Sequence, residues 1–160
     1  MKESIELVIK KVIPKDDTDA QELIGELDKE LLQRYPASSV HMLDLDKITN
    51  QSGTFLVGYV SGIAVSCCSV CEIEPGVGEV KRVFVKPQYR RKGIAESMME
   101  SLEEQAAECG FKFLRAETGH KQPEAIAMYQ KLGYYDIDKY GEYINDPNSL
   151  CMEKRLTNGE

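Results

Sequence analysis

Residues 79–96 decide the fold that this sequence predicts, and they read E-V-K-R-V-F-V-K-P-Q-Y-R-R-K-G-I-A-E. The apolar residues of the first half, Val80 and 83–85, are typical of a buried strand, and Pro87 ends it because proline has no backbone N–H to donate. After Gly93 the apolar residues recur at helical spacing, at Ile94, Ala95, Met98, Met99, Leu102, Ala106 and Cys109. The stretch is therefore predicted to form a strand, a basic turn and a helix.

The turn is cationic and lies where the helix begins. A helix N-terminus carries N–H groups without partners and roughly +0.5 of an elementary charge, so it favours anions. Gly93 lets the backbone approach a ligand closely. The cationic residues of the stretch are Lys81, Arg82, Lys86, Arg90, Arg91 and Lys92. A polyphosphate ligand and a solvated basic loop both explain this pattern, and composition alone does not separate them.

Length and composition are those of an ordinary globular chain. The 160 residues, 29% charged and 42% hydrophobic, predict one domain spanning residues 1–160. The net charge of -7 argues against nucleic acid or an anionic membrane as the main partner. No apolar run reaches membrane-spanning length, and the N-terminus lacks the apolar core of a signal peptide. A cytoplasmic location is therefore expected.

The five cysteines are expected to be free thiols. Cys67, Cys68 and Cys71 have a spacing that invites a metal interpretation. They fall in a strand-like run, however, where Cys67 and Cys68 would point to opposite faces. No second Cys pair or His lies nearby to complete a tetrahedral site. The sequence therefore predicts small core thiols and no metal.

The remaining patterns predict the order β-α-loop-β-β-β-α-β-α-β-β. Strands are expected at 5–13, 54–60, 63–73, the central stretch from Glu79, 111–118, 134–139 and 150–156. Helices are expected at 18–35, 94–109 and 123–132, the first beginning at a capping box on Thr18 and the last with Pro123 in its first turn. This order predicts an α/β (α+β) fold, a mixed sheet with helices on its faces.

Two motifs in this framework resemble the GCN5-related N-acetyltransferase (GNAT) family. Residues 90–95, R-R-K-G-I-A, fit the pattern [Q/R]-x-x-G-x-[G/A] of the family's coenzyme A pyrophosphate loop. Residues 122–134, Q-P-E-A-I-A-M-Y-Q-K-L-G-Y, resemble its second motif, an apolar-faced helix with a tyrosine and then a Gly-aromatic step. The resemblance covers nearly the whole chain and extends to a group of uncharacterised bacterial acetyltransferases. It implies a mostly antiparallel sheet of six to seven strands, with helices on both faces and a splay between the fourth and fifth strands.

The resemblance also implies a reaction, the transfer of acetyl from acetyl-CoA to a primary amine of a small molecule or protein, by direct attack in a ternary complex. The alternative is a non-catalytic acyl-CoA-binding module that regulates a partner protein. A longer acyl donor, the identity of the amine acceptor and a homodimer all remain open.

Cofactor contacts follow from the matched positions. The backbone N–H groups from Arg91 to Ala95, through Gly93 and Ile94, would hold the pyrophosphate, with charge added by the Arg90, Arg91 and Lys92 side chains. The backbones of Val83, Phe84 and Val85 would bind the pantetheine and the thioester oxygen. Gln122 is a further candidate cofactor contact; it stands where the family often has asparagine, which is a better N-cap than glutamine.

Catalytic candidates follow in the same way. Tyr129 matches the tyrosine that protonates the departing CoA thiolate. Glu79 stands where some relatives place a base, although a solvated strand-edge carboxylate beside Lys81 would look the same. Glu117, at the end of the neighbouring strand, is the other candidate base, or a ligand for the substrate ammonium.

The acceptor pocket is expected to come from two loops, 35–52 and 140–149, because loops on rigid scaffolds carry specificity. Tyr35 and His41 are therefore candidate substrate residues. An exposed loop histidine explains His41 equally well, and no Ser or Cys partner suggests a triad.

Overall fold

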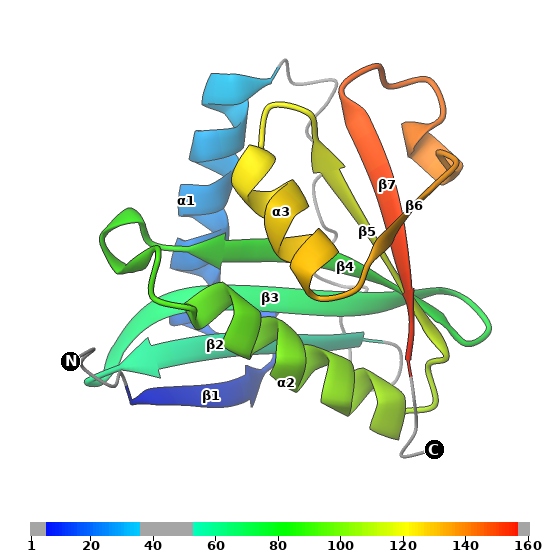
Figure 1. Ribbon diagram of the computed structural model, residues 1–160. Helices are drawn as coiled ribbons and strands as arrows, with labels where there is room; N and C mark the ends of the chain where they lie inside the picture. Colours follow the sequence, from blue (N-terminus) through cyan, green and yellow to red (C-terminus); the bar gives the residue numbers. More distant parts are fainter. Residues whose placement is uncertain (1–5, 36–52, 157–160) are drawn as a thin grey trace.

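The computed structural model describes residues 6–35 and 53–156, and these form a mixed sheet in the order β1-β2-β3-β4-β5-β7-β6 (Figure 1). The strands are β1 (Leu7–Val12), β2 (Gly53–Val60), β3 (Ile63–Glu74), β4 (Val77–Val85), β5 (Phe113–Gly119), β6 (Tyr135–Ile137) and β7 (Ser149–Arg155). All neighbouring pairs are antiparallel except β4 and β5, which are parallel. The predicted mixed, mostly antiparallel sheet is confirmed.

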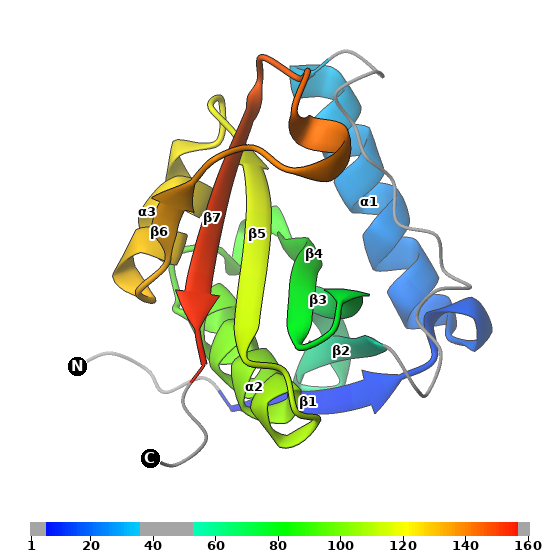
Figure 2. The same ribbon diagram turned by 90° about the vertical axis from the view of Figure 1, so that its right-hand side faces the viewer.

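Helices cover both faces of this sheet, as predicted (Figure 2). They are α1 (Thr18–Arg34), α2 (Ile94–Glu108) and α3 (Pro123–Lys131). Helix α1 packs Leu23 and Leu27 on a cluster with Phe55, whereas α2 and α3 pack on the opposite face. The two faces separate neighbouring thiols: Cys67 belongs to the α1 cluster and Cys68 to the other.

The middle of the sheet splays open between β4 and β5. The two strands pair from Val77 opposite Phe113 to Val80 opposite Ala116, and β4 then runs on to Val85. At the same level the β3–β4 register shifts, and Arg82 adopts a left-handed φ of 60°. Such a bulge kinks a strand and leaves part of its backbone unpaired. The predicted splay therefore coincides with a bulge in β4.

Several predicted boundaries move by a few residues. Strand β4 begins at Val77, so Glu79 lies inside the strand and does not open it. Helix α1 is capped by Asp17, whose side chain accepts a 2.8 Å hydrogen bond from the backbone N–H of Ala20, and not by Thr18. Asp is among the best N-cap residues, so it takes the role when it precedes Thr. Within residues 6–35 and 53–156, no helix combines the length and apolar character that crossing a membrane requires.

Candidate active site

The basic turn between β4 and α2 is built to expose backbone N–H groups. Gly93 caps α2 with a φ of 79°, and Arg91 also adopts a positive φ, of 64°. The carbonyl of Gly93 accepts from Ser97 N, so the helix begins directly after the glycine. The first N–H groups of a helix have no intrahelical partner, which leaves those of Ile94 and Ala95 free to face an anion.

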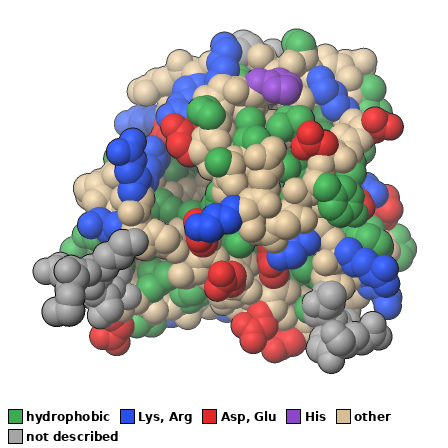
Figure 3. All heavy atoms as spheres, in the orientation of Figure 1, with side chains coloured by type: hydrophobic (Ala, Val, Ile, Leu, Met, Phe, Trp, Pro, Cys, Tyr) green, Lys and Arg blue, Asp and Glu red, His purple; other side chains and the backbone are tan. Residues whose placement is uncertain are grey.

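A cavity of about 430 Å³ lies against this turn. It brings together most of the residues predicted to bind the cofactor, namely Val83, Phe84, Val85, Arg90, Arg91, Gly93, Ile94, Ala95 and Gln122. Lys92 and Tyr129 are not among the described residues that line it. Figure 3 shows Lys and Arg side chains at the left of this face, on the side where the turn lies in Figure 1. The cavity, the free N–H groups and the cations suit an elongated polyanionic ligand.

The six cations of this stretch do not form one cluster. Lys81 lies 3.4 Å from Glu79, and Arg82 pairs with Asp28 of α1. Arg90 donates to the carbonyl of Val85 at 2.8 Å and pairs with an α1 carboxylate, as does Lys86 at longer range. Within the described part of the chain, only Arg91 and Lys92 of the six make no ion pair. These two are exposed and remain the side chains that can meet a ligand's phosphates.

A second, smaller cavity of about 130 Å³ opens beside the first. It lies between the C-terminal half of α1, the splayed ends of β4 and β5, and the segment before β7. The two cavities share five lining residues, Leu27, Val83, Gln122, Ala125 and Met128. Because they share these walls, a ligand that fills the larger cavity can present one end to whatever occupies the smaller one.

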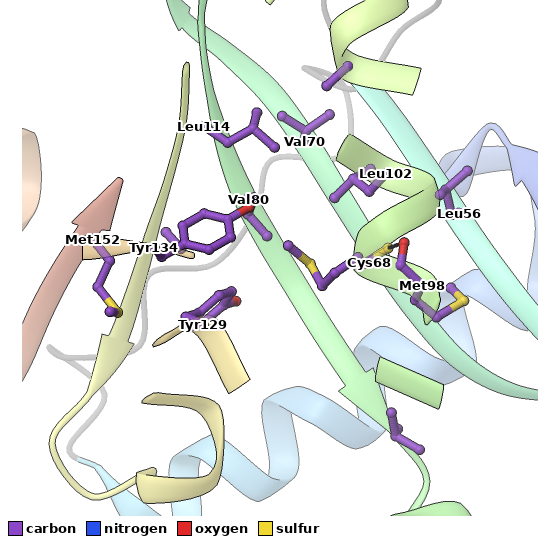
Figure 4. Close-up of a cluster of buried hydrophobic side chains, with 14 of the residues drawn as sticks. Leu56, Cys68, Val70, Val80, Met98, Leu102, Leu114, Tyr129, Tyr134 and Met152 are labelled. Atoms are coloured by element: carbon purple, nitrogen blue, oxygen red, sulfur yellow. Dashed lines mark hydrogen bonds between the residues drawn. The ribbon is translucent and has the colours of Figure 1, made fainter. Parts of the chain in front are cut away.

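Tyr129 stands in the wall of the smaller cavity. Its ring is 4% exposed and packs edge-to-face on Tyr134 with centroids 5.2 Å apart, and both rings lie between β4 and β5 (Figure 4). Within the described residues its hydroxyl makes no hydrogen bond, yet it is not among the fully buried unpaired atoms. Burial raises the pKa of Tyr129 well above its usual value, with Cys68 and Glu117 adding to the effect. A phenol is protonated at neutral pH, so this hydroxyl can donate a proton.

Glu79 is buried, not solvated, and its side chain is held on several sides. It is 6% exposed, and its Oε2 accepts a 2.6 Å hydrogen bond from the hydroxyl of Tyr140. The Lys81 ammonium lies 3.4 Å from its Oε1, and the side chain of Tyr143 also bonds it. Glu79 is not among the described residues that line the smaller cavity. Glu79, the first of the two candidate bases, is thus surrounded by hydrogen-bond donors and a lysine ammonium.

Glu117, by contrast, lines the smaller cavity, as does Tyr35. The Oε2 of Glu117 accepts from the hydroxyl of Ser149 at 2.8 Å. A second acid in this wall is Asp146, which is buried and accepts from Asn148 N at 2.9 Å. His41 lies outside the described residues. The smaller cavity therefore has two carboxylates beside Tyr129.

Two residues of this wall, Tyr143 and Asp146, had not been predicted as site residues from the sequence. The loop that holds them had been predicted to join the pocket, but it has no periodic pattern that tells which side chains turn inward. Gln122 had been singled out, and its side-chain oxygen accepts from Gly119 N at 3.2 Å. The amide thus closes the turn between β5 and α3 while lining both cavities.

No three His, Cys, Asp or Glu side chains of the described residues come together as a metal site. The four buried cysteines are reduced, and burial raises the pKa of the Cys67 thiol to about 12. Cys67, Cys68 and Cys71 belong to the two core clusters, and Cys151 is a buried residue of β7. They behave as small apolar residues, as the sequence predicted.

Comparison with known proteins agrees with this geometry. Residues 19–134 match the Acetyltransferase (GNAT) family. An IAA acetyltransferase of Azospirillum brasilense is 43% identical over 84% of this chain and 89% of its own length. The uncharacterised N-acetyltransferase YsnE of Bacillus subtilis is 28% identical over 76% of this chain and 82% of its own. The chain therefore belongs to the GNAT family and is an N-acetyltransferase.

Solved structures show the same fold. A Klebsiella pneumoniae protein described as an acyl-CoA N-acyltransferase superposes with a TM-score of 0.83 at 33% identity, covering 94% of this chain and 98% of that one. The PaiA N-acetyltransferase of Thermoplasma acidophilum, solved in complex with coenzyme A, has a TM-score of 0.70 at 18% identity and covers 94% and 99%. The second likeness concerns the fold alone.

Proposed function

We propose that this protein transfers the acetyl group of acetyl-CoA to a primary amine of a small molecule, by direct attack within a ternary complex. The observation that carries the proposal is the junction of the two cavities: the larger suits the cofactor, the smaller suits a compact amine, and Tyr129 stands in the wall beside their shared residues. Membership of the GNAT family and the IAA acetyltransferase activity named for the Azospirillum relative support the donor and a small acceptor.

The donor would lie along the larger cavity. Its pyrophosphate would face the free N–H groups around Gly93, with charge supplied by Arg91 and Lys92. Its pantetheine would run along the backbone of 83–85, which the splay leaves without a partner on the β5 side. A backbone N–H there, aimed at the developing oxyanion, is worth about 3–4 kcal/mol.

The acceptor would enter the smaller cavity as an ammonium ion. An alkyl ammonium has a pKa of about 10 and must lose a proton before its nitrogen can attack. This deprotonation costs about 4 kcal/mol at neutral pH. Glu117 faces this cavity and is the carboxylate we assign to receive the ammonium and its proton. Glu79 is the alternative, but it would have to act through water because its oxygens are engaged by Tyr140 and Lys81.

The transfer step then balances within the site. The amine nitrogen forms a bond to the thioester carbonyl carbon, the carbon–sulfur bond breaks, and the CoA thiolate takes a proton from Tyr129. The proton that the nitrogen loses on becoming an amide nitrogen restores the Tyr129 hydroxyl. The hydroxyl of Tyr129 suits this role because a phenol is protonated at neutral pH and this one has no competing acceptor among the described residues.

A screen of acetyl-CoA with primary amines, amino acids and peptides tests the proposal. Free thiol release coupled to acetylated product in the mass spectrum supports it. Tight acetyl-CoA binding with no product from any amine would instead favour a non-catalytic acyl-CoA-binding module. Repeating the active pair with longer acyl-CoA donors measures which acyl chain the larger cavity accepts.

A further inference from the structure

The side chain of Tyr35 occupies the space that any side chain at position 119 would fill. Tyr35 follows α1 directly, and its ring is 6% exposed. A Cβ built on Gly119 would lie 2.9 Å from the ring's Cε1 and closer still to Cζ and the hydroxyl oxygen. Gly119 has no positive φ, so its backbone does not demand glycine. It is the approach of Tyr35 that requires it.

The ring is fixed there by further contacts. Its hydroxyl accepts a 2.9 Å hydrogen bond from the backbone N–H of Lys121, and the Lys121 ammonium lies 5.6 Å from the ring centroid. The backbone N–H of Tyr35 still bonds the carbonyl of Leu31 in α1. Tyr35 therefore joins the end of α1 to the turn after β5, and it cannot swing away without losing these bonds.

The contact closes one end of the smaller cavity. Tyr35 and Gly119 line that cavity but not the larger one, whereas the residues shared by both mark the junction with the cofactor. An amine that enters with its nitrogen at the junction thus extends toward the Tyr35 ring. Burial raises the pKa of the Tyr35 hydroxyl, and the charges of Glu117 and Asp146, which lie near the ring, add to the rise.

We infer that Tyr35 is a specificity-determining residue that limits the length of the acceptor amine, and that Gly119 is the positioning residue that lets it do so. This inference rests on the proposed function. With the ring in place the cavity of about 130 Å³ admits a compact amine. Without the ring the cavity gains the space that the ring fills against Gly119, and a longer amine fits.

The test measures kcat/KM for a series of linear primary alkylamines and diamines of increasing length with acetyl-CoA. Tyr35→Ala is expected to raise the ratio of long-chain to short-chain kcat/KM by about tenfold or more, the size of effect that one or two methylenes have in a pocket. Tyr35→Phe keeps the ring but loses the bond from Lys121 N, and as the matched control its length profile should stay closer to that of the wild type than the profile of Tyr35→Ala does. An unchanged profile in Tyr35→Ala would overturn the inference.

The variant Gly119→Ala gives a second, independent test of the contact between Tyr35 and Gly119. The added methyl displaces the ring, so kcat/KM for the short amines should fall about tenfold. The double variant Gly119→Ala, Tyr35→Ala removes the clashing partner, so its thermal midpoint and its length profile should return to those of Tyr35→Ala alone. A double variant no more stable than Gly119→Ala contradicts the contact, whatever the activity. If the wild type acetylates no amine, the proposed function and this inference both fail. If the wild type is active and Tyr35→Ala keeps the wild-type length profile, the inference alone is overturned.

Discussion

The carboxylate of Glu79 accepts a 2.6 Å hydrogen bond from the hydroxyl of Tyr140, 61 residues further along the chain. Tyr140 and Tyr143 pack edge-to-face with centroids 5.4 Å apart, and Tyr143 also bonds Glu79. One buried carboxylate on β4 thus holds the segment that carries Tyr143 and Asp146 into the smaller cavity. Glu79 therefore shapes the proposed acceptor site even though it does not line it.

Tyr140→Phe should lower the free energy of unfolding by about 1.5–3 kcal/mol, because it removes a hydrogen bond to a buried charged group. Denaturant unfolding measures the change. Tyr135→Phe is the matched control, since its hydroxyl bonds Glu153 at 2.8 Å on the exposed surface and should cost little. Equal losses in the two variants would show that Glu79 is not held as described.

Glu79→Gln and Glu117→Gln separate positioning from proton transfer. If Glu117 receives the ammonium proton, Glu117→Gln should lower kcat/KM for the amine about 10²-fold or more and change the acid limb of the pH profile. Glu79→Gln should lower it less and leave the shape of the profile intact. Steady-state kinetics across pH measures both variants, and the reverse order would make Glu79 the base.

The basic turn could be predicted from the sequence because all of its determinants are local. A strand, a glycine that permits a φ of 79° and an apolar helix follow one another within residues 79–109. The orientations of Lys81 and Arg82 could not be predicted in this way. The bulge at Arg82, a non-glycine residue with a left-handed φ, reverses the expected alternation of side chains between the two faces of the sheet. The acid that pairs with Arg82 lies 54 residues away on α1.

The residues of the candidate site also fall into two groups, those that local sequence motifs predict and those that they do not. Tyr129 and the residues that line the larger cavity belong to two motifs that the sequence displays. The burial of Glu79, the contact of Tyr35 with Gly119 and the inward turn of Asp146 depend on packing between distant segments, and no periodic pattern in the sequence encodes them.

Arg91→Glu should raise the KM for acetyl-CoA about tenfold or more while leaving kcat within a few-fold, because Arg91 lines the larger cavity without an ion pair. Lys15→Glu, far from the cavities on the turn before α1, is the matched control for the change in net charge. Initial rates at varied acetyl-CoA give both constants. An unchanged KM in Arg91→Glu would contradict the assignment of the turn to the cofactor's phosphates.

Alkaline pH should unfold the protein through its buried tyrosines. Burial raises the pKa values of Tyr129, Tyr134, Tyr140 and Tyr143 above the ordinary value of 10.0, so the folded state favours the neutral phenols. Their contribution to stability is complete below pH 10 and is lost above it, where the unfolded chain ionises first. Phenolate absorbance and circular dichroism should therefore change together. Full ionisation near pH 10 with native dichroism would refute this burial.

The role of Tyr129 as proton donor is tested by the kcat of Tyr129→Phe with acetyl-CoA and the best amine of the screen. Tyr134→Phe is the control. Tyr134 is the buried neighbour of Tyr129, and its hydroxyl is already engaged by Glu103 at 2.9 Å. If Tyr129 protonates the CoA thiolate, kcat should fall by about 10²–10⁴ in Tyr129→Phe and stay within a few-fold in Tyr134→Phe. A Tyr129→Phe variant with the wild-type kcat would show that Tyr129 does not protonate the CoA thiolate.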